Sequence, residues 1–199
     1  MLDTPACRFS ETVSDSGNNA ILLAPNVTSV PIPDNSFVPT YPYASGTYSD
    51  GPVWAQTLAS MLGLSANPSL LHGTDYAFGG ATTGPLNPAP AGLAPPSLEA
   101  QAAIFLSAHN GVAPGNALYV VEGGAEEVLH VLAAMPVCGG DPVCINTIVE
   151  LTVASFTRTM DNIVSALQRV GEAISLSGMC RTLEMRQPSV RRATRRWGR

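Results

Sequence analysis

Apolar residues recur at the three- and four-residue spacing of an amphipathic helix in four segments of this chain. The segments are Pro52–Leu62, Ser97–His109, Ala125–Met135 and Val143 to about Val170. Three of them begin with residues that favour a helix start: Pro52 suits a first turn, Ser97 an N-cap, and Asp141-Pro142 the entry to the last helix. The pattern therefore predicts four helices.

Two short apolar runs have a different pattern. Tyr76–Phe78 and Ala117–Val121 are continuous apolar stretches flanked by glycines, which is typical of buried parallel strands. Strands that alternate with helices along a chain indicate a layered α/β fold.

Composition agrees with a folded domain. At 199 residues and 45% apolar residues, the chain suits one domain with a sizeable core rather than a disordered segment. Its 18 glycines and 17 prolines, many in stretches such as residues 86–96, predict long surface loops. No run approaches the roughly 20 apolar residues of a transmembrane helix. The first residues, MLDTPACRFS, lack the basic start and apolar stretch of a secretory signal.

The chain has a net charge of −5, and its charged residues are unevenly distributed along the sequence. The chain has no lysine, and seven of its ten arginines lie in the last nineteen residues with a single acid. A basic tail of this kind is one possible nucleic-acid or anionic-membrane arm. This tail has one aromatic residue, Trp197, and no helical periodicity, so no nucleic-acid partner is expected.

Three sequence blocks carry the candidate chemistry. The first block is FSETVSDSGN (residues 9–18), the second is DYAFGGATTG (75–84), and the third is GNALYVVEGGAEEVL (115–129). Between the first two lies the helical segment TYSDGPVWAQTLASMLGL (47–64). In this order they resemble the motif blocks of the GDSL (SGNH) ester hydrolases over roughly residues 9–170. Agreement of several blocks in order is much stronger than a match to one short motif.

The resemblance implies a flavodoxin-like three-layer α/β/α sandwich with a parallel sheet, incomplete at the C-terminus. It divides the chain into a partial hydrolase-like domain, residues 1–171, and a basic, irregular tail, residues 172–199. A sheet without its last strands exposes an edge and an apolar face, which predicts marginal stability or aggregation.

The same resemblance implies hydrolysis of carboxylic ester bonds through an acyl-enzyme, without a cofactor, on a small-molecule or lipid ester. Many members of the family are exported, so it implies a secreted or periplasmic location, although no signal peptide is recognisable. A non-catalytic pseudo-hydrolase that serves as a ligand-binding or interaction module is the alternative interpretation.

Three positions of the reacting centre follow from the resemblance. Thr12 stands at the nucleophilic serine, Gly80 at an oxyanion-hole glycine that donates its backbone N–H, and Glu126 at the asparagine of that hole. Thr12 keeps a hydroxyl, but its methyl group stiffens χ1, and a polar turn residue is an equally good interpretation. Ionised Glu126 can only accept hydrogen bonds, so it would oppose a developing oxyanion. These substitutions predict impaired activity.

The family's catalytic base is not recognisable, because no Asp-x-x-His pair follows residue 130. The chain's histidines, His72, His109 and His130, all precede that region. Glu126 and Glu127 share one helix face with His130, a spacing that would allow a metal ligand set. A solvated first helical turn with ordinary charge pairing is the favoured interpretation, and no metal is expected.

Other residues have structural interpretations. Asp15, Gly17 and Asn18 match the first block as it stands and are expected to shape its turn. Cys138 and Cys144 flank a turn-rich loop, so they form either a small disulfide or two free thiols.

Both ends of the chain fit a frameshift hypothesis. Ser10–Val13 can be encoded so that an adjacent frame spells Gly-Asp-Ser and the start of a leucine codon. Met179–Ser189 can be encoded so that another frame spells Val-Pro-Asp-Leu-Gly, the loop that the family has at this point. The nucleotide sequence decides between shifted frames and true substitutions.

Overall fold

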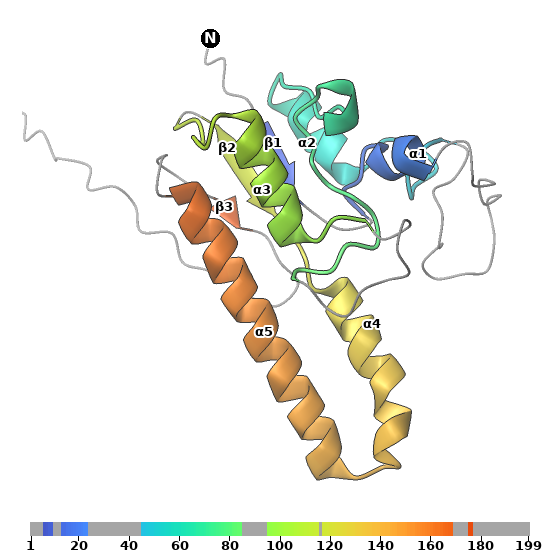
Figure 1. Ribbon diagram of the computed structural model, residues 1–199. Helices are drawn as coiled ribbons and strands as arrows, with labels where there is room; N and C mark the ends of the chain where they lie inside the picture. The colour runs from blue at the N-terminus through green and yellow to red at the C-terminus, as the bar shows by residue number, and fades with distance from the viewer. Residues whose placement is uncertain are drawn as a thin grey trace, which may run out of the picture.

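The computed structural model describes residues 6–9, 13–23, 45–84, 95–115, 117–168 and 175–176 (Figure 1). In chain order the described elements are β1 (Ala6–Phe9), α1 (Asn18–Leu23), α2 (Trp54–Met61), the 3-10 turn η1 (Ser69–Leu71), α3 (Leu98–Ala108), β2 (Leu118–Val121), α4 (Ala125–Ala134), the 3-10 turn η2 (Met135–Cys138), α5 (Pro142–Gln168) and β3 (Ser175–Leu176). The mixed α/β character that the sequence predicts is confirmed.

The described strands pair in parallel in the order β1-β2-β3. Ala6 is paired with Leu118 and Phe9 with Val121, so β1 and β2 end side by side. β3 pairs with the last two residues of β2 and lies within the segment 172–199 that the sequence predicts to be irregular. The described sheet has three strands, and the three-layer sandwich remains a prediction.

All four predicted helices are present, with boundaries within two residues of the prediction. Ser97 caps α3 as expected, since its Oγ accepts the backbone N–H of Ala100 at 3.3 Å. α2 begins at Trp54, two residues after the predicted start, and the N–H of Val53 donates to the side chain of Gln56 at 3.1 Å.

The strand predicted at Tyr76–Phe78 is wrong, because these residues form an irregular segment. Side chains bind both backbone groups of Ala77, at the centre of this segment. Asn18 Nδ2 donates to the carbonyl oxygens of Asp75 and Ala77 at 2.8 and 2.9 Å. The carboxylate of Asp75 accepts the N–H of Ala77 at 3.0 Å. A short apolar run shows burial but not what satisfies its backbone.

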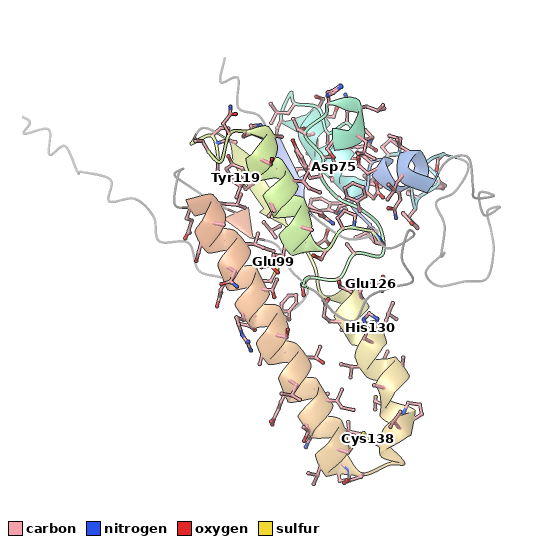
Figure 2. All side chains as sticks on the ribbon, viewed as in Figure 1. Asp75, Glu99, Tyr119, Glu126, His130 and Cys138 are labelled. Carbon is pink, nitrogen blue, oxygen red and sulfur yellow. A yellow bond between two sulfur atoms is a disulfide. The ribbon has the colours of Figure 1, made fainter. Side chains whose placement is uncertain are left out.

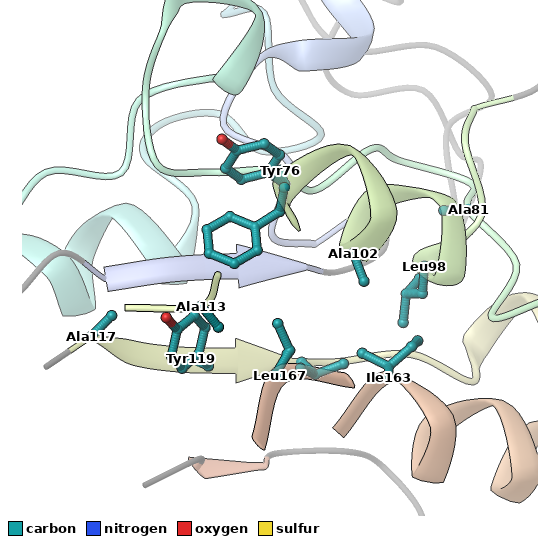
Figure 3. Close-up of a cluster of buried hydrophobic side chains, with 11 residues drawn as sticks. Tyr76, Ala81, Leu98, Ala102, Ala113, Ala117, Tyr119, Ile163 and Leu167 are labelled. Carbon is teal, nitrogen blue, oxygen red and sulfur yellow. The ribbon is translucent and has the colours of Figure 1, made fainter. Parts of the chain in front are cut away.

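The main core forms where α3 and the C-terminal half of α5 pack on β2 (Figure 3). Phe105 of α3 is at its centre, with edge-to-face contacts to Tyr76 and Tyr119 at centroid distances of 5.4 and 5.8 Å. Ile163 and Leu167 of α5 complete the cluster and are almost fully buried. Burial of these side chains packs both helices against β2, which lies inside the third block.

α4 and α5 form an antiparallel pair that extends well away from the sheet (Figure 1). Their far ends are joined by a disulfide between Cys138 and Cys144, which decides the question that the sequence leaves open. Several apolar side chains on this pair are exposed, among them Leu132 and Val153 at 55% and 56%. None of the described helices is long and apolar enough to cross a membrane.

Replacing both cysteines, as Cys138→Ser with Cys144→Ser, should lower the free energy of unfolding by about 2 kcal/mol, because the bond closes a short loop in the unfolded chain. Thermal denaturation with and without a thiol reductant measures this effect. The wild type should melt at a lower temperature in reductant, and the double variant should be insensitive to it. An equal response of both proteins to reductant would contradict the assignment.

Candidate functional site

The first and third blocks leave the carboxyl ends of two adjacent parallel strands. The first block starts at Phe9, the last residue of β1, and this residue pairs with Val121, the last residue of β2, inside the third block. In open α/β sheets, binding and catalytic residues gather at this edge. The two blocks are therefore adjacent from the point at which their strands end.

Asp15 links the first block to the second. Its buried carboxylate accepts four backbone N–H groups: those of Gly17 and Asn18 at Oδ1, 2.8 and 2.7 Å, and those of Asn19 and Gly79 at Oδ2, 3.1 and 2.9 Å. Three of these donors open α1, where a carboxylate also interacts favourably with the helix dipole. Burial raises the pKa of Asp15, while the four hydrogen bonds act in the opposite direction.

Asn18 also links the first block to the second, and both the nitrogen and the oxygen of its side-chain amide take part. Its Nδ2 donates to the carbonyl oxygens of Asp75 and Ala77, and its Oδ1 accepts the N–H of Leu70 at 3.1 Å and the hydroxyl of Ser69 at 3.3 Å. The side chain is fully buried, so these partners replace the water that it loses. The structural role expected for Asp15 and Asn18 agrees with these contacts.

Asn19 and Tyr48 extend this network toward Gly80. Asn19 Nδ2 donates to the carbonyl oxygen of Gly79 at 2.6 Å and to the hydroxyl of Tyr48 at 2.8 Å. A Cβ on Gly79 would lie 2.2 Å from the Tyr48 ring, so only glycine permits this contact. Burial raises the pKa of Tyr48 to about 12, and the charges of Asp15 and Glu126 add to the rise.

Asp75 places a second buried carboxyl group beside the first. Its Oδ2 accepts the N–H of Ser16 at 3.0 Å, and its Oδ1 accepts the N–H of Ala77 at 3.0 Å. Burial raises the pKa of Asp75 to about 7, and the nearby charge of Asp15 contributes to the rise against these hydrogen bonds. Two buried acids in one network disfavour double ionisation.

The third block is bound to both of the others. Ser14 of the first block donates its hydroxyl to Glu122 Oε2 at 2.6 Å. Thr83 of the second block donates both its N–H and its hydroxyl to Glu127 Oε1, each at 2.7 Å. Direct hydrogen bonds thus join all three pairs of blocks.

The first turn of α4 is not the solvated surface that the sequence favours. Glu127 is only 4% exposed, because Thr83 binds its carboxylate inside the fold. Glu126 is half-buried, and His130 lies one turn further along the helix (Figure 2). Burial raises the pKa of Glu126, the charge of Glu127 raises it further, and His130 opposes the rise.

The structure describes two of the three predicted site residues. Thr12 lies outside the described residues. Gly80 has a φ of +76°, a conformation that favours glycine. Glu126 lies close enough to Tyr48 to raise the pKa of its hydroxyl, and Tyr48 packs on Gly79, the neighbour of Gly80.

His72 and His109 line a pocket with Tyr76 and Phe78 of the second block, and His130 directly follows the third block. His109 Nδ1 lies 2.9 Å from the carbonyl oxygen of Phe105 in its own helix. His130 is exposed, and His72 lies in a turn of positive φ next to η1. Among the described residues, no group of three or more histidine, cysteine, aspartate or glutamate side chains is arranged to hold a metal ion.

Several residues of this network are missed by the sequence interpretation: Tyr48, Asn19, Asp75, Thr83 and Glu122. Asp75 and Thr83 belong to the second block, where glycine alone is singled out. The one available signal is the density of Asp, Asn, Ser and Thr in apolar surroundings, since buried polar side chains need partners. No protein-family model and no curated protein matches this chain.

Asp15→Asn should lower the free energy of unfolding by about 3 kcal/mol, because an amide nitrogen would face N–H groups that the carboxylate now accepts. Urea denaturation measures the change. Asp50→Asn, at an exposed position, is the matched control and should shift stability by less than about 0.5 kcal/mol. Equal effects of the two substitutions would show that the Asp15 contacts contribute nothing specific.

Asp75 should make the protein less stable as pH rises. Its pKa is about 7 in the fold against an ordinary value of 3.8, so the folded state favours the neutral acid. Its stabilising contribution is complete below the ordinary value and is lost as pH rises toward about 7. Asp75→Asn cannot ionise, so its unfolding free energy, measured in urea across this range, should fall less steeply with pH than that of the wild type or Asp50→Asn. Identical slopes would contradict the assignment.

Proposed function

We propose that this chain is a relative of the GDSL/SGNH ester hydrolases whose activity on carboxylic ester bonds is impaired. The observation that carries the proposal is the network in which Ser14–Glu122, Asp15–Gly79 and Thr83–Glu127 hydrogen bonds join the three blocks. Blocks that are separate in sequence but share one buried polar network fit a single site better than unrelated turns.

The fold proposed with this function is the family's three-layer sandwich. Its support is the parallel pairing of β1 with β2, with α2 and α3 in the connection between them. A parallel pair requires such a crossover, and the blocks follow the carboxyl ends of its strands.

The proposed reaction is attack by a hydroxyl group on an ester carbonyl, with transient formation of an acyl-enzyme and release of an alcohol. Thr12 supplies the hydroxyl, Gly80 supplies an N–H to the oxyanion, and water then releases the acid from the acyl-enzyme. No cofactor takes part. Without a recognisable histidine base, the expected turnover is that of a site with binding and oxyanion contacts but weak activation of the nucleophile.

Glu126 is the main source of impairment in this scheme. As a carboxylate it faces the developing oxyanion with an acceptor, whereas its protonated form has an O–H to donate. The raised pKa of Glu126 increases the neutral fraction at mildly acidic pH. A neutral carboxylic acid is a competent donor to an oxyanion in other enzymes.

Turnover of a short-chain aryl ester should therefore rise as pH falls through the pKa of Glu126. Glu126→Gln has a permanent donor, so it should be faster than the wild type by about tenfold or more at pH 8 and should lose this acid-dependent rise. Glu150→Gln, on the exposed part of α5, is the matched control and should keep the wild-type profile.

Thr12 variants separate enzyme from pseudo-enzyme. Turnover should disappear in Thr12→Ala and increase in Thr12→Ser. Absence of turnover in the wild type, Thr12→Ser and Glu126→Gln at every pH would overturn the hydrolase and leave the non-catalytic module as the function of this fold.

A further inference from the structure

The space between α4 and α5 is an apolar groove with a volume of about 440 Å³. Val128 and Leu132 line it from α4, and Val149, Val153 and Phe156 line it from α5. Grooves of several hundred Å³ with apolar walls and a few polar groups are the usual sites for small ligands. The size and lining suit an elongated hydrocarbon chain.

The inner end of the groove is shaped by close packing. Gly124, the residue before α4, has a φ of +117°, and a Cβ there would lie 3.1 Å from the Phe156 ring. Glycine at this position allows the two helices to approach at their inner ends. The groove therefore has a defined end next to the first turn of α4.

Glu127 lies at this end and is the only ionisable residue among the described residues that line the groove. Its Oε1 accepts two hydrogen bonds from Thr83, whereas its buried Oε2 has no hydrogen-bond partner. A buried polar atom without a partner is costly, by about 1–3 kcal/mol and more for a charged group. A buried polar atom without a partner, on a residue that lines a groove, indicates a missing donor.

We propose that this groove binds an alkylammonium-type amphiphile, with its hydrocarbon chain between α4 and α5 and its cationic head on Glu127. A cation is favoured over a neutral donor because hydrogen bonds between charged groups are about twice as strong as neutral ones. The other described residues that line the groove are uncharged. This site holds whether or not the chain hydrolyses esters, because it uses neither Thr12 nor Gly80.

Calorimetric titration of the full chain at pH 7 with n-octylammonium, n-octanol and n-octanoate, below their micelle concentrations, tests the head-group preference. Octylammonium should bind at least about tenfold more tightly than octanoate, with octanol between them. Butylammonium should bind more weakly than octylammonium, because it buries less hydrocarbon. Equal affinities for octylammonium and octanoate, or no binding of octylammonium, would overturn the proposal.

Two variants locate the site. Glu127→Gln keeps an oxygen for Thr83 but puts an NH₂ group in place of Oε2, so octylammonium affinity should fall at least about tenfold. Val153→Arg fills the groove from an exposed position and should abolish binding, whereas Val143→Arg, on the same helix outside the groove, should not. Unchanged affinity in Glu127→Gln or Val153→Arg would refute the assignment. A concentration-dependent dimer that dissociates in the Val153→Arg variant would also refute the assignment, because a second copy of the chain would then cover the groove.

Discussion

A single buried carboxylate organises this fold. Asp15 gathers four backbone N–H groups, three from the start of α1 and one from Gly79, which lies 64 residues away in the chain. An acceptor with two oxygens satisfies more buried donors than any neutral side chain of its size. Around it, Asn18, Asn19 and Asp75 form further bonds between the same two segments. The irregular backbone of the second block depends on these side chains as a strand depends on its neighbours.

The same principle explains the features at the start of α4. Thr83 binds one oxygen of Glu127 and so draws a charged residue inside the fold. The other oxygen is buried without a hydrogen-bond partner, and Glu127 also lines an apolar groove. Glu126, one residue earlier, is half-buried and has a raised pKa. In the proposed hydrolase, an acid thus stands where a neutral donor is expected, and its role depends on its proton.

Helices could be predicted well from this sequence, because their signals are local. The apolar spacing and caps such as Ser97 act within a few residues, and the structure places all four helices where they are expected. The strand at Leu118–Val121 was also predictable from its continuous apolar run.

Other features could not be predicted, because they depend on side-chain hydrogen bonds between residues that are far apart in the sequence. Tyr76–Phe78 resembles a strand, but Asn18, nearly sixty residues earlier, binds the carbonyl oxygen of Ala77 and that of the preceding Asp75. The sequence predicts that Glu127 lies at the surface, but Thr83 binds its carboxylate inside the fold. Of the candidate site, the structure describes Gly80 and Glu126, while Thr12 and most of the basic tail lie outside the described residues.

Native-state hydrogen exchange tests the central claim, that buried side chains hold the second block in place. The account predicts that the amides of Ala77, Gly79 and Thr83 are protected as strongly as those of β2, because they donate to Asp75, Asp15 and Glu127 inside the fold. These protons should then exchange only when the whole domain unfolds. Exchange of all three at the rate of an exposed loop such as residues 49–51, with β2 still protected, would contradict it.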